Sequence, residues 1–205
     1  MQKWFAFDLD GTVTCEETLP LLARELDLVE EMERLTRLTL EGRIPFAESF
    51  SHRFRLLREI PVARIQEIMD GVRLDEDISG FIRRNRDSCA IVTGNLDVWI
   101  EPMVRKLGCR CYSSVSSMGA DGGLVLEEIV DKAGVVRTLQ ENGGKVIAVG
   151  DSFNDIPMFR AADVAIAYGG IHPLTEHAVS AADYAVSDGG ELCRLLERLS
   201  MDAEE

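Results

Sequence analysis

The hydrophobic pattern divides the chain into a helical stretch near the N-terminus and an alternating stretch that follows it. Between Glu16 and Met69, apolar residues recur every three or four positions, which predicts about four short helices. Pro45 and Pro61 stand where two of these helices would begin, a favoured place for proline. From Leu74 onward, helical stretches alternate with short β-rich runs. This alternation predicts a mostly parallel sheet with crossover helices.

The individual runs define the expected elements of that sheet. Strands are predicted at residues 4–7, 89–92, 111–115, 145–149, 164–167 and 184–186, with a hairpin tip at 121–123. Helices are predicted at residues 77–86, 96–107, 131–141, 157–162 and 191–199. The expected fold class is therefore α/β, a doubly wound, Rossmann-like parallel sheet with a small inserted helical domain. We expect residues 1–14 and 75–205 to form the core and residues 15–74 to form the helical insert.

The composition and net charge of the chain limit which classes of molecule it is expected to bind. The 205 residues include 22 Lys and Arg against 36 Asp and Glu, a net charge of −14. Such a surface repels nucleic acid and anionic membranes, so neither is expected as a partner. No apolar run approaches the ~18 residues of a membrane span. Five cysteines, an odd number without signs of secretion, predict reduced thiols in the cytoplasm.

Three of the predicted strands end in polar, loop-forming residues. In a parallel sheet these carboxyl ends converge on one edge, where open α/β sheets bind their ligands. Four carboxylates at one edge favour a hard divalent cation, and Mg²⁺ fits best because it also takes a substrate phosphate as a ligand. The groups are Asp8 and Asp10 after the first strand, Thr93, Gly94 and Asn95 after the second, and Asp151, Asn154 and Asp155 after the strand at 145–149.

These residue types can perform phosphoryl transfer. One aspartate could attack phosphorus and carry it as an acyl phosphate. The other could protonate the leaving oxygen and later activate water. Thr93 and nearby backbone N–H groups could bind phosphoryl oxygens. Lys132, at the start of the predicted helix after the hairpin, is the candidate cation that offsets the charge of those oxygens.

In this order, the motifs resemble those of the haloacid dehalogenase (HAD) superfamily of aspartate-nucleophile phosphatases, over nearly the whole chain. Asp8-Leu9-Asp10-Gly11-Thr12 resembles the first motif of the superfamily, and Thr93 resembles the second. Lys132 resembles the third motif, and residues 150–155 resemble the fourth. The resemblance implies that Asp8 is the nucleophile and a Mg²⁺ ligand, that Asp10 is the acid/base and a ligand through its backbone carbonyl, and that Asp151 is the third protein ligand. It also implies that Asp155 lies in the second shell of the metal, where it orients Lys132. Thr93 and Gly94 would hold the phosphoryl group, and Asn154 would bind the substrate.

Within the superfamily, the chain is most similar to phosphoserine phosphatases and their near relatives. The insert implies a helical cap of the C1 type, and residues 46–57 resemble the cap helix of that family. Arg53 falls where the family binds a substrate carboxylate, Glu17 where it binds an amine, and Phe46 at an apolar position of the same pocket. Alternatively, Glu17 is a charge at a helix start and Arg53 belongs to a solvated basic face.

Several functional alternatives stay open at this point. Asn95 stands where phosphoserine phosphatases usually carry a second Gly, which puts a side chain beside the phosphate. Relatives with such a cap act on other small phosphomonoesters, and a few transfer the phosphoryl group to an alcohol. A receiver-like or ligand-binding module would also use an acidic cluster, a Thr and a Lys on a parallel sheet. The leading prediction is a Mg²⁺-dependent phosphomonoesterase acting on a small phosphorylated metabolite.

Overall fold

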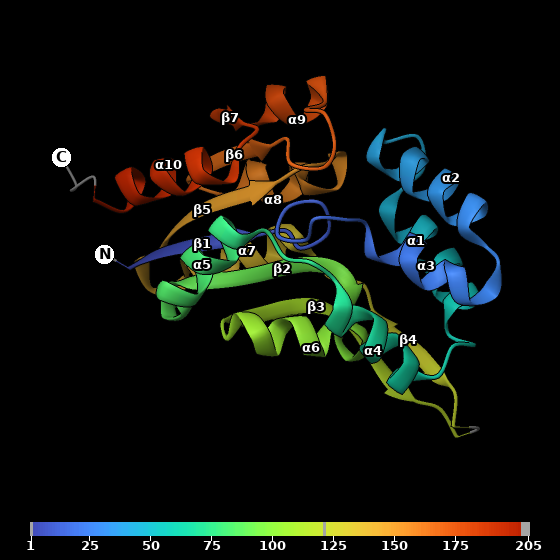
Figure 1. Cartoon of the computed structure of the whole chain (residues 1–205). Helices are drawn as coiled ribbons and strands as arrows, with labels where there is room; N and C mark the ends of the chain where they lie inside the picture. Colours follow the sequence, from blue (N-terminus) through green and yellow to red (C-terminus); the bar gives the residue numbers. More distant parts are fainter. Residues whose placement is uncertain (1, 121, 202–205) are drawn as a thin grey trace.

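A computed structural model describes residues 2–120 and 122–201 of the chain (Figure 1). Its centre is a seven-stranded sheet with the strand order β4-β3-β2-β1-β5-β6-β7. Neighbouring strands are parallel except β3 and β4, which form an antiparallel hairpin at one edge. The strands are β1 (Lys3–Phe7), β2 (Cys89–Leu96), β3 (Arg110–Met118), β4 (Leu124–Glu128), β5 (Lys145–Gly150), β6 (Val164–Tyr168) and β7 (Tyr184–Val186).

Helices cover both faces of this sheet and also form a separate group beside it. One face carries α5 (Glu76–Arg84), α6 (Asp97–Leu107) and α10 (Gly189–Met201), and the other carries α7 (Lys132–Gln140), α8 (Ile156–Ala161) and α9 (Glu176–Ala181). The separate group contains α1 (Thr18–Ala23), α2 (Val29–Leu40), α3 (Phe46–Leu57) and α4 (Val62–Gly71). Short 3₁₀ turns are η1 (Arg24–Leu26), η2 (Arg86–Ser88), η3 (Glu141–Gly143) and η4 (Phe153–Asp155).

The central strand β1 shows why the inner strands of the sheet are mostly apolar. Its side chains alternate between the two faces, and both faces are covered by helices. Phe5 and Phe7 belong to the core under α5, α6 and α10, where the Phe5 ring meets the Phe81 ring edge-on at 5.1 Å between centroids. Trp4 and Ala6 belong to the smaller core under α7 and α8. In β1 this double burial leaves the first polar side chain after the strand at Asp8.

The helical group α1–α4 joins the rest of the chain at two segments that lie side by side. Thr14 and Leu74 form an isolated antiparallel bridge. The Cys15 N–H donates to the Arg73 carbonyl at 2.9 Å, and the Asp75 N–H donates to the Val13 carbonyl at 2.9 Å. The chain therefore leaves the sheet and returns to it at one place, and Figure 1 shows α1, α2 and α3 beside the end toward which β1, β2 and β5 point.

The predicted fold class is confirmed, with local differences. Strand β2 continues to Leu96 rather than ending at Val92, with a shift in its pairing to β3 between these residues. Helix α9 was not predicted because only Ala178 in it is buried, so it has no apolar periodicity; the Thr175 hydroxyl caps it by accepting from the Ala178 N–H at 3.2 Å. The predicted hairpin joins β3 and β4, and Asp121 in its tip lies outside the described residues.

Candidate active site

A small cavity of about 50 Å³ lies between the carboxyl ends of the strands and the helical group. Both parts of the chain contribute to its walls. The predicted site residues that line it are Asp8, Asp10, Thr93, Gly94, Asp151 and Asn154 from the core, and Glu17, Phe46 and Arg53 from the helical group. Asn95, which the sequence singled out as a departure from the family pattern, lines it too.

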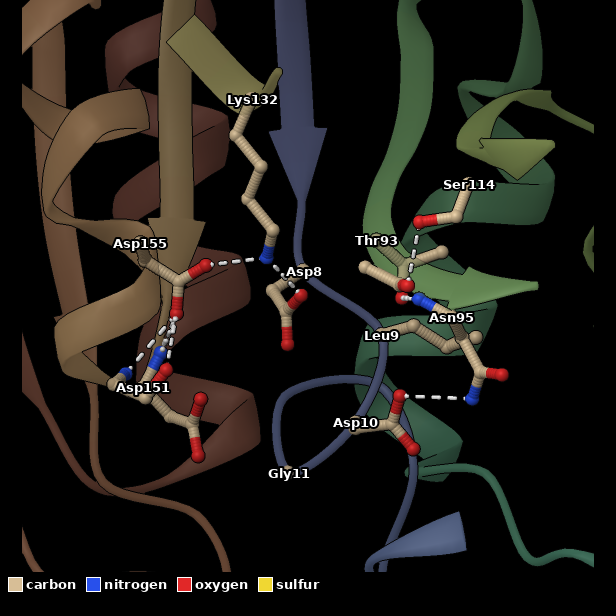
Figure 2. Close-up of polar contacts among 12 residues, drawn as sticks. Asp8, Leu9, Asp10, Gly11, Thr93, Asn95, Ser114, Lys132, Asp151 and Asp155 are labelled. Carbon is tan, nitrogen blue, oxygen red and sulfur yellow. Dashed lines mark hydrogen bonds and ion pairs between the residues drawn. The ribbon is translucent and has the colours of Figure 1, made fainter. Parts of the chain in front are cut away.

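Three buried carboxylates gather around one lysine beside this cavity. Asp8, Asp151 and Asp155 each present an oxygen, and the three atoms lie within 4.8 Å of one another. Lys132, the first residue of α7, reaches between two of them (Figure 2). Its ammonium donates to Asp155 Oδ1 at 2.7 Å and also to Asp8 Oδ1. The structure thus brings together four residues that are up to 147 positions apart in the sequence.

Burial dominates the electrostatics of this cluster. It raises the pKa of Asp8 well above its usual value, although the ammonium of Lys132 acts in the opposite direction. Burial and the nearby Asp155 likewise raise the pKa of Asp151 well above its usual value. For Lys132, burial disfavours the charged form, but Asp155 and Asp8 more than offset it, so its pKa is raised. Three acids against one ammonium leave a surplus of negative charge that a cation or a proton must balance.

The donor set fits a hard divalent cation. Asp151 Oδ2 is buried without a hydrogen-bond partner in the described residues, an unusual state for a carboxylate oxygen. Both oxygens of Asp155 are already used, Oδ1 by Lys132 and Oδ2 by the N–H groups of Asp151 at 3.1 Å and Ser152 at 3.0 Å. Gly11, at φ +79°, keeps this space open, because a side chain there would collide with the Asp151 carboxylate. Asp8 and Asp151 are therefore the carboxylates available to Mg²⁺.

Asp10 lines the same cavity but turns its carboxylate away from the other three acids. Its Oδ1 accepts from the N–H of Thr18 at 3.2 Å and from the Thr18 hydroxyl. Its Oδ2 accepts from Asn95 Nδ2 at 3.2 Å (Figure 2). Burial, followed by the charge of Glu17, raises the pKa of Asp10, while the bonds from Thr18 and Asn95 act in the opposite direction. A carboxyl group with a raised pKa can carry a proton for transfer.

The end of β2 forms a cradle that the helical group touches. The Thr93 hydroxyl oxygen accepts from the Asn95 N–H at 3.1 Å, so its own proton is not used in that bond. The Gly94 carbonyl accepts from the Ser114 hydroxyl at 2.8 Å. A side chain at position 94 would collide with the Phe46 ring of α3. Glycine at this position therefore lets α3 lie directly on the loop.

Arg53 is a buried cation on the cavity wall. It is 4% exposed, and burial lowers its pKa. Its Nη1 donates to the Thr36 hydroxyl at 3.3 Å, and its guanidinium lies 6.0 Å from the centre of the Phe46 ring. Among the residues that the structure describes, none forms a salt bridge with it within 4 Å. Such a guanidinium is available to an anionic ligand.

Two contributors to the site were not predicted. Thr18 holds Asp10, and His172 Nε2 lies 2.8 Å from Glu17 Oε1. Thr18 stands at the start of a helix, where hydroxyl residues are common, so the sequence offers no signal for a role at Asp10. His172 is separated from Glu17 by 155 residues in a loop without a motif. Both pairings depend on how the helical group meets the sheet edge.

No helix in the described ranges, 2–120 and 122–201, is long and apolar enough to cross a membrane.

Comparison with known proteins gives the family. A model of haloacid dehalogenase-like hydrolases matches residues 5–160, three quarters of the chain. The chain belongs to this family. The resemblance inferred from the four motifs is thereby confirmed.

Within the family the chain is similar to phosphoserine phosphatases. That of Methanocaldococcus jannaschii is 29% identical over 182 residues, 82% of this chain and 85% of the relative. That of Halobacterium salinarum is 28% identical over 195 residues, 87% of this chain and 92% of the relative. A solved phosphoserine phosphatase described as a phospho-aspartyl intermediate analogue has a TM-score of 0.80 and 25% identity, covering 96% of this chain and 98% of that one. The chain is a phosphatase of the HAD type that resembles these enzymes along most of its length.

Proposed function

We propose that the chain is a Mg²⁺-dependent phosphomonoesterase that forms an aspartyl phosphate on Asp8 and acts on a small phosphorylated metabolite such as phosphoserine. The proposal rests on one observation, which is that a single cavity brings together the candidate nucleophile and the candidate substrate-binding residues. Asp8 with its lysine lies on one wall, and the buried Arg53 and Glu17 lie on another. The names of the relatives support the substrate class.

In the first step, an Asp8 oxygen attacks phosphorus while the bond from phosphorus to the ester oxygen breaks. Asp10 gives its proton to the leaving oxygen, in keeping with its raised pKa. The ammonium of Lys132, held by Asp155, offsets charge on the phosphoryl oxygens. The Thr93 hydroxyl and the backbone N–H of Gly94 orient the phosphoryl group, with Asn154 at the cavity rim.

In the second step, Asp10 acts as a base. Its carboxylate takes a proton from water while the water oxygen attacks phosphorus and the bond to Asp8 breaks. Inorganic phosphate leaves, Asp8 is restored as a carboxylate and Asp10 is protonated again. The bonds from Thr18 and Asn95 keep the Asp10 carboxylate in place through both steps.

Mg²⁺ would be held by the carboxylates of Asp8 and Asp151 and by the backbone carbonyl of Asp10. When bound, it would supply the positive charge that keeps Asp8 ionised and offsets the charge of the phosphoryl group. Asp155 would not bind it directly, because both of its oxygens already accept hydrogen bonds. The free oxygen of Asp151 supports this assignment.

The helical insert, residues 15–74, would act as a cap on the core formed by residues 1–14 and 75–205. Arg53 would bind a substrate carboxylate through its two-pronged guanidinium, and Glu17 would bind an ammonium group. Phe46 would pack against the substrate's apolar atoms. The five cysteines are all free, which fits an enzyme of the reducing cytoplasm.

The test is phosphate release from a panel of small phosphomonoesters that includes L-phosphoserine and p-nitrophenyl phosphate, with Mg²⁺ and then with a chelator. We expect metal-dependent release, fastest from L-phosphoserine. Release from other esters but not from phosphoserine would keep the chemistry and reject the roles of Arg53 and Glu17. Low release accompanied by phosphorylation of an added alcohol would instead assign the chain to the phosphotransferases, which use the same aspartyl phosphate.

A further inference from the structure

His172 contacts the cap from the core side of the molecule. It lies in the loop between β6 and α9, and its Nε2 is 2.8 Å from Oε1 of Glu17, the residue that precedes α1. A carboxylate can only accept, so the proton of this hydrogen bond is on the histidine. The contact ties one oxygen of Glu17 to the core.

The two residues occupy different sides of one wall. Glu17 lines the active-site cavity, and it also lines a neighbouring outer cleft together with His172 and Pro173. His172 therefore reaches Glu17 from the outer cleft, and its ring nitrogen also lies within 4.8 Å of a carboxylate oxygen of Asp151. Its hydrogen-bond contact with the cavity wall is to the Glu17 carboxylate.

The backbone of the His172 loop is held close to the catalytic edge. A side chain at Gly170 would fall against the Tyr168 ring and 3.2 Å from the Gly11 carbonyl oxygen. Glycine at this position lets the loop lie on the turn that follows Asp8 and Asp10. His172 therefore lies in a loop that packs against the turn following Asp8 and Asp10.

We propose that His172 is a positioning residue that holds Oε1 of Glu17 and leaves Oε2 for the substrate's ammonium group. The inference rests on the proposed function, in which Glu17 binds that ammonium. A glutamate has several rotatable bonds, and fixing it before the substrate arrives removes an ordering cost from binding. We expect this to improve the affinity for amine-bearing substrates by about three- to tenfold, without affecting substrates that lack the amine.

The experiment compares L-phosphoserine with its des-amino analogue, 3-(phosphonooxy)propanoate, at saturating Mg²⁺. For His172→Ala we expect KM for phosphoserine to rise about three- to tenfold with kcat within about twofold, and no change with the analogue. His172→Gln places an amide N–H where Nε2 was and should restore most of the loss. His52→Ala, on α3 with a side chain 46% exposed, removes an imidazole away from the site and should match the wild type.

Each contrary outcome has its own meaning. An equal loss on both substrates, or a changed Mg²⁺ requirement, would make His172 a structural or metal-site residue, since Asp151 lies near it too. A lower KM for phosphoserine in His172→Ala would show competition with the amine and overturn the inference. If the wild type prefers phosphoserine and His172→Ala changes nothing, the inference alone fails. If the wild type shows no preference for the amine, both the inference about His172 and the proposed role of Glu17 are wrong. Turnover of p-nitrophenyl phosphate then tests the proposed phosphatase chemistry separately.

Discussion

At the scale of the residue, Lys132 shows how one side chain depends on its partners. Lys132 is buried between Asp8 and Asp155, and these two acids raise its pKa. Burial in turn raises the pKa of Asp8. A buried charge is tolerated only where opposite charges and hydrogen bonds compensate it. Asp155 is anchored by backbone N–H groups, so it can hold the lysine during the attack proposed for Asp8.

The proposed nucleophile is tested by Asp8→Asn. The amide oxygen can still accept from Lys132, so we expect the variant to fold with a Tm close to that of the wild type. It lacks the carboxylate that attacks phosphorus, so phosphate release should fall by roughly a thousandfold or more. Steady-state turnover and circular dichroism check the two halves of this prediction. Asp87→Asn, an exposed acid in η2, is the matched control, and substantial activity in folded Asp8→Asn protein would reject the mechanism.

At the scale of the element, helix α3 presents one face to the cavity and another to solvent. Phe46, Phe50 and Arg53 lie on the inner face, one to two turns apart, and the first two rings stack at 5.5 Å between centroids. Arg55, two residues further, is on the outer face, where its Nε donates to the Ser51 carbonyl. Two arginines on one helix therefore have different surroundings, and of the two only Arg53 lines the cavity.

The substrate role of Arg53 predicts a selective loss in Arg53→Ala. Removal of a charge-assisted hydrogen bond costs about 1.5–3 kcal/mol, so KM for L-phosphoserine should rise by roughly ten- to a hundredfold. Turnover of p-nitrophenyl phosphate, which has no carboxylate near the phosphate, should change little. Arg55→Ala serves as the control on the same helix. An equal loss on both substrates would mean that Arg53 supports the cap without binding a carboxylate.

At the scale of the whole molecule, the parallel sheet brings distant motifs to one edge. The ends of β1, β2 and β5 meet beside the helical group, and α7 contributes Lys132 (Figures 1 and 2). The cluster is buried, and burial raises the pKa of Asp8 and of Asp151. A cation bound at this cluster, as proposed, would favour the ionised carboxylates and so stabilise the folded site.

Mg²⁺ should therefore stabilise the folded protein measurably. At a concentration a hundred times its Kd, a ligand adds about 2.7 kcal/mol, which for a chain of this length raises Tm by roughly 5–10 °C. A thermal melt with and without Mg²⁺, at constant ionic strength, measures this shift. Asp151→Asn removes the unpartnered carboxylate and should abolish most of it. A shift of equal size in that variant would place the metal elsewhere.

The sequence predicted the strands, their order of polar ends and the helical insert because strong local patterns encode them. Asp8, Thr93, Lys132 and Asp151 were identified in this way, and the structure places them at one edge. The extension of β2 to Leu96 was missed, because Thr-Gly-Asn has the composition of a loop. The strand pairs with β3 at Val92 and again at Leu96, with a shift of register between them. Helix α9 was missed because it buries too little to leave a pattern.

By itself, the sequence determined the family, the fold class and the acids that face the sheet edge, since periodicity and motif spacing are properties of neighbouring residues. Only the tertiary structure decided that Asp10 turns toward Thr18 and Asn95, that Arg53 is buried without a salt bridge among the described residues, and that His172 meets Glu17. The Asp10–Asn95 and Glu17–His172 contacts join residues that are 85 and 155 positions apart in the chain. They depend on how two packed surfaces fit together, and no local pattern records that fit.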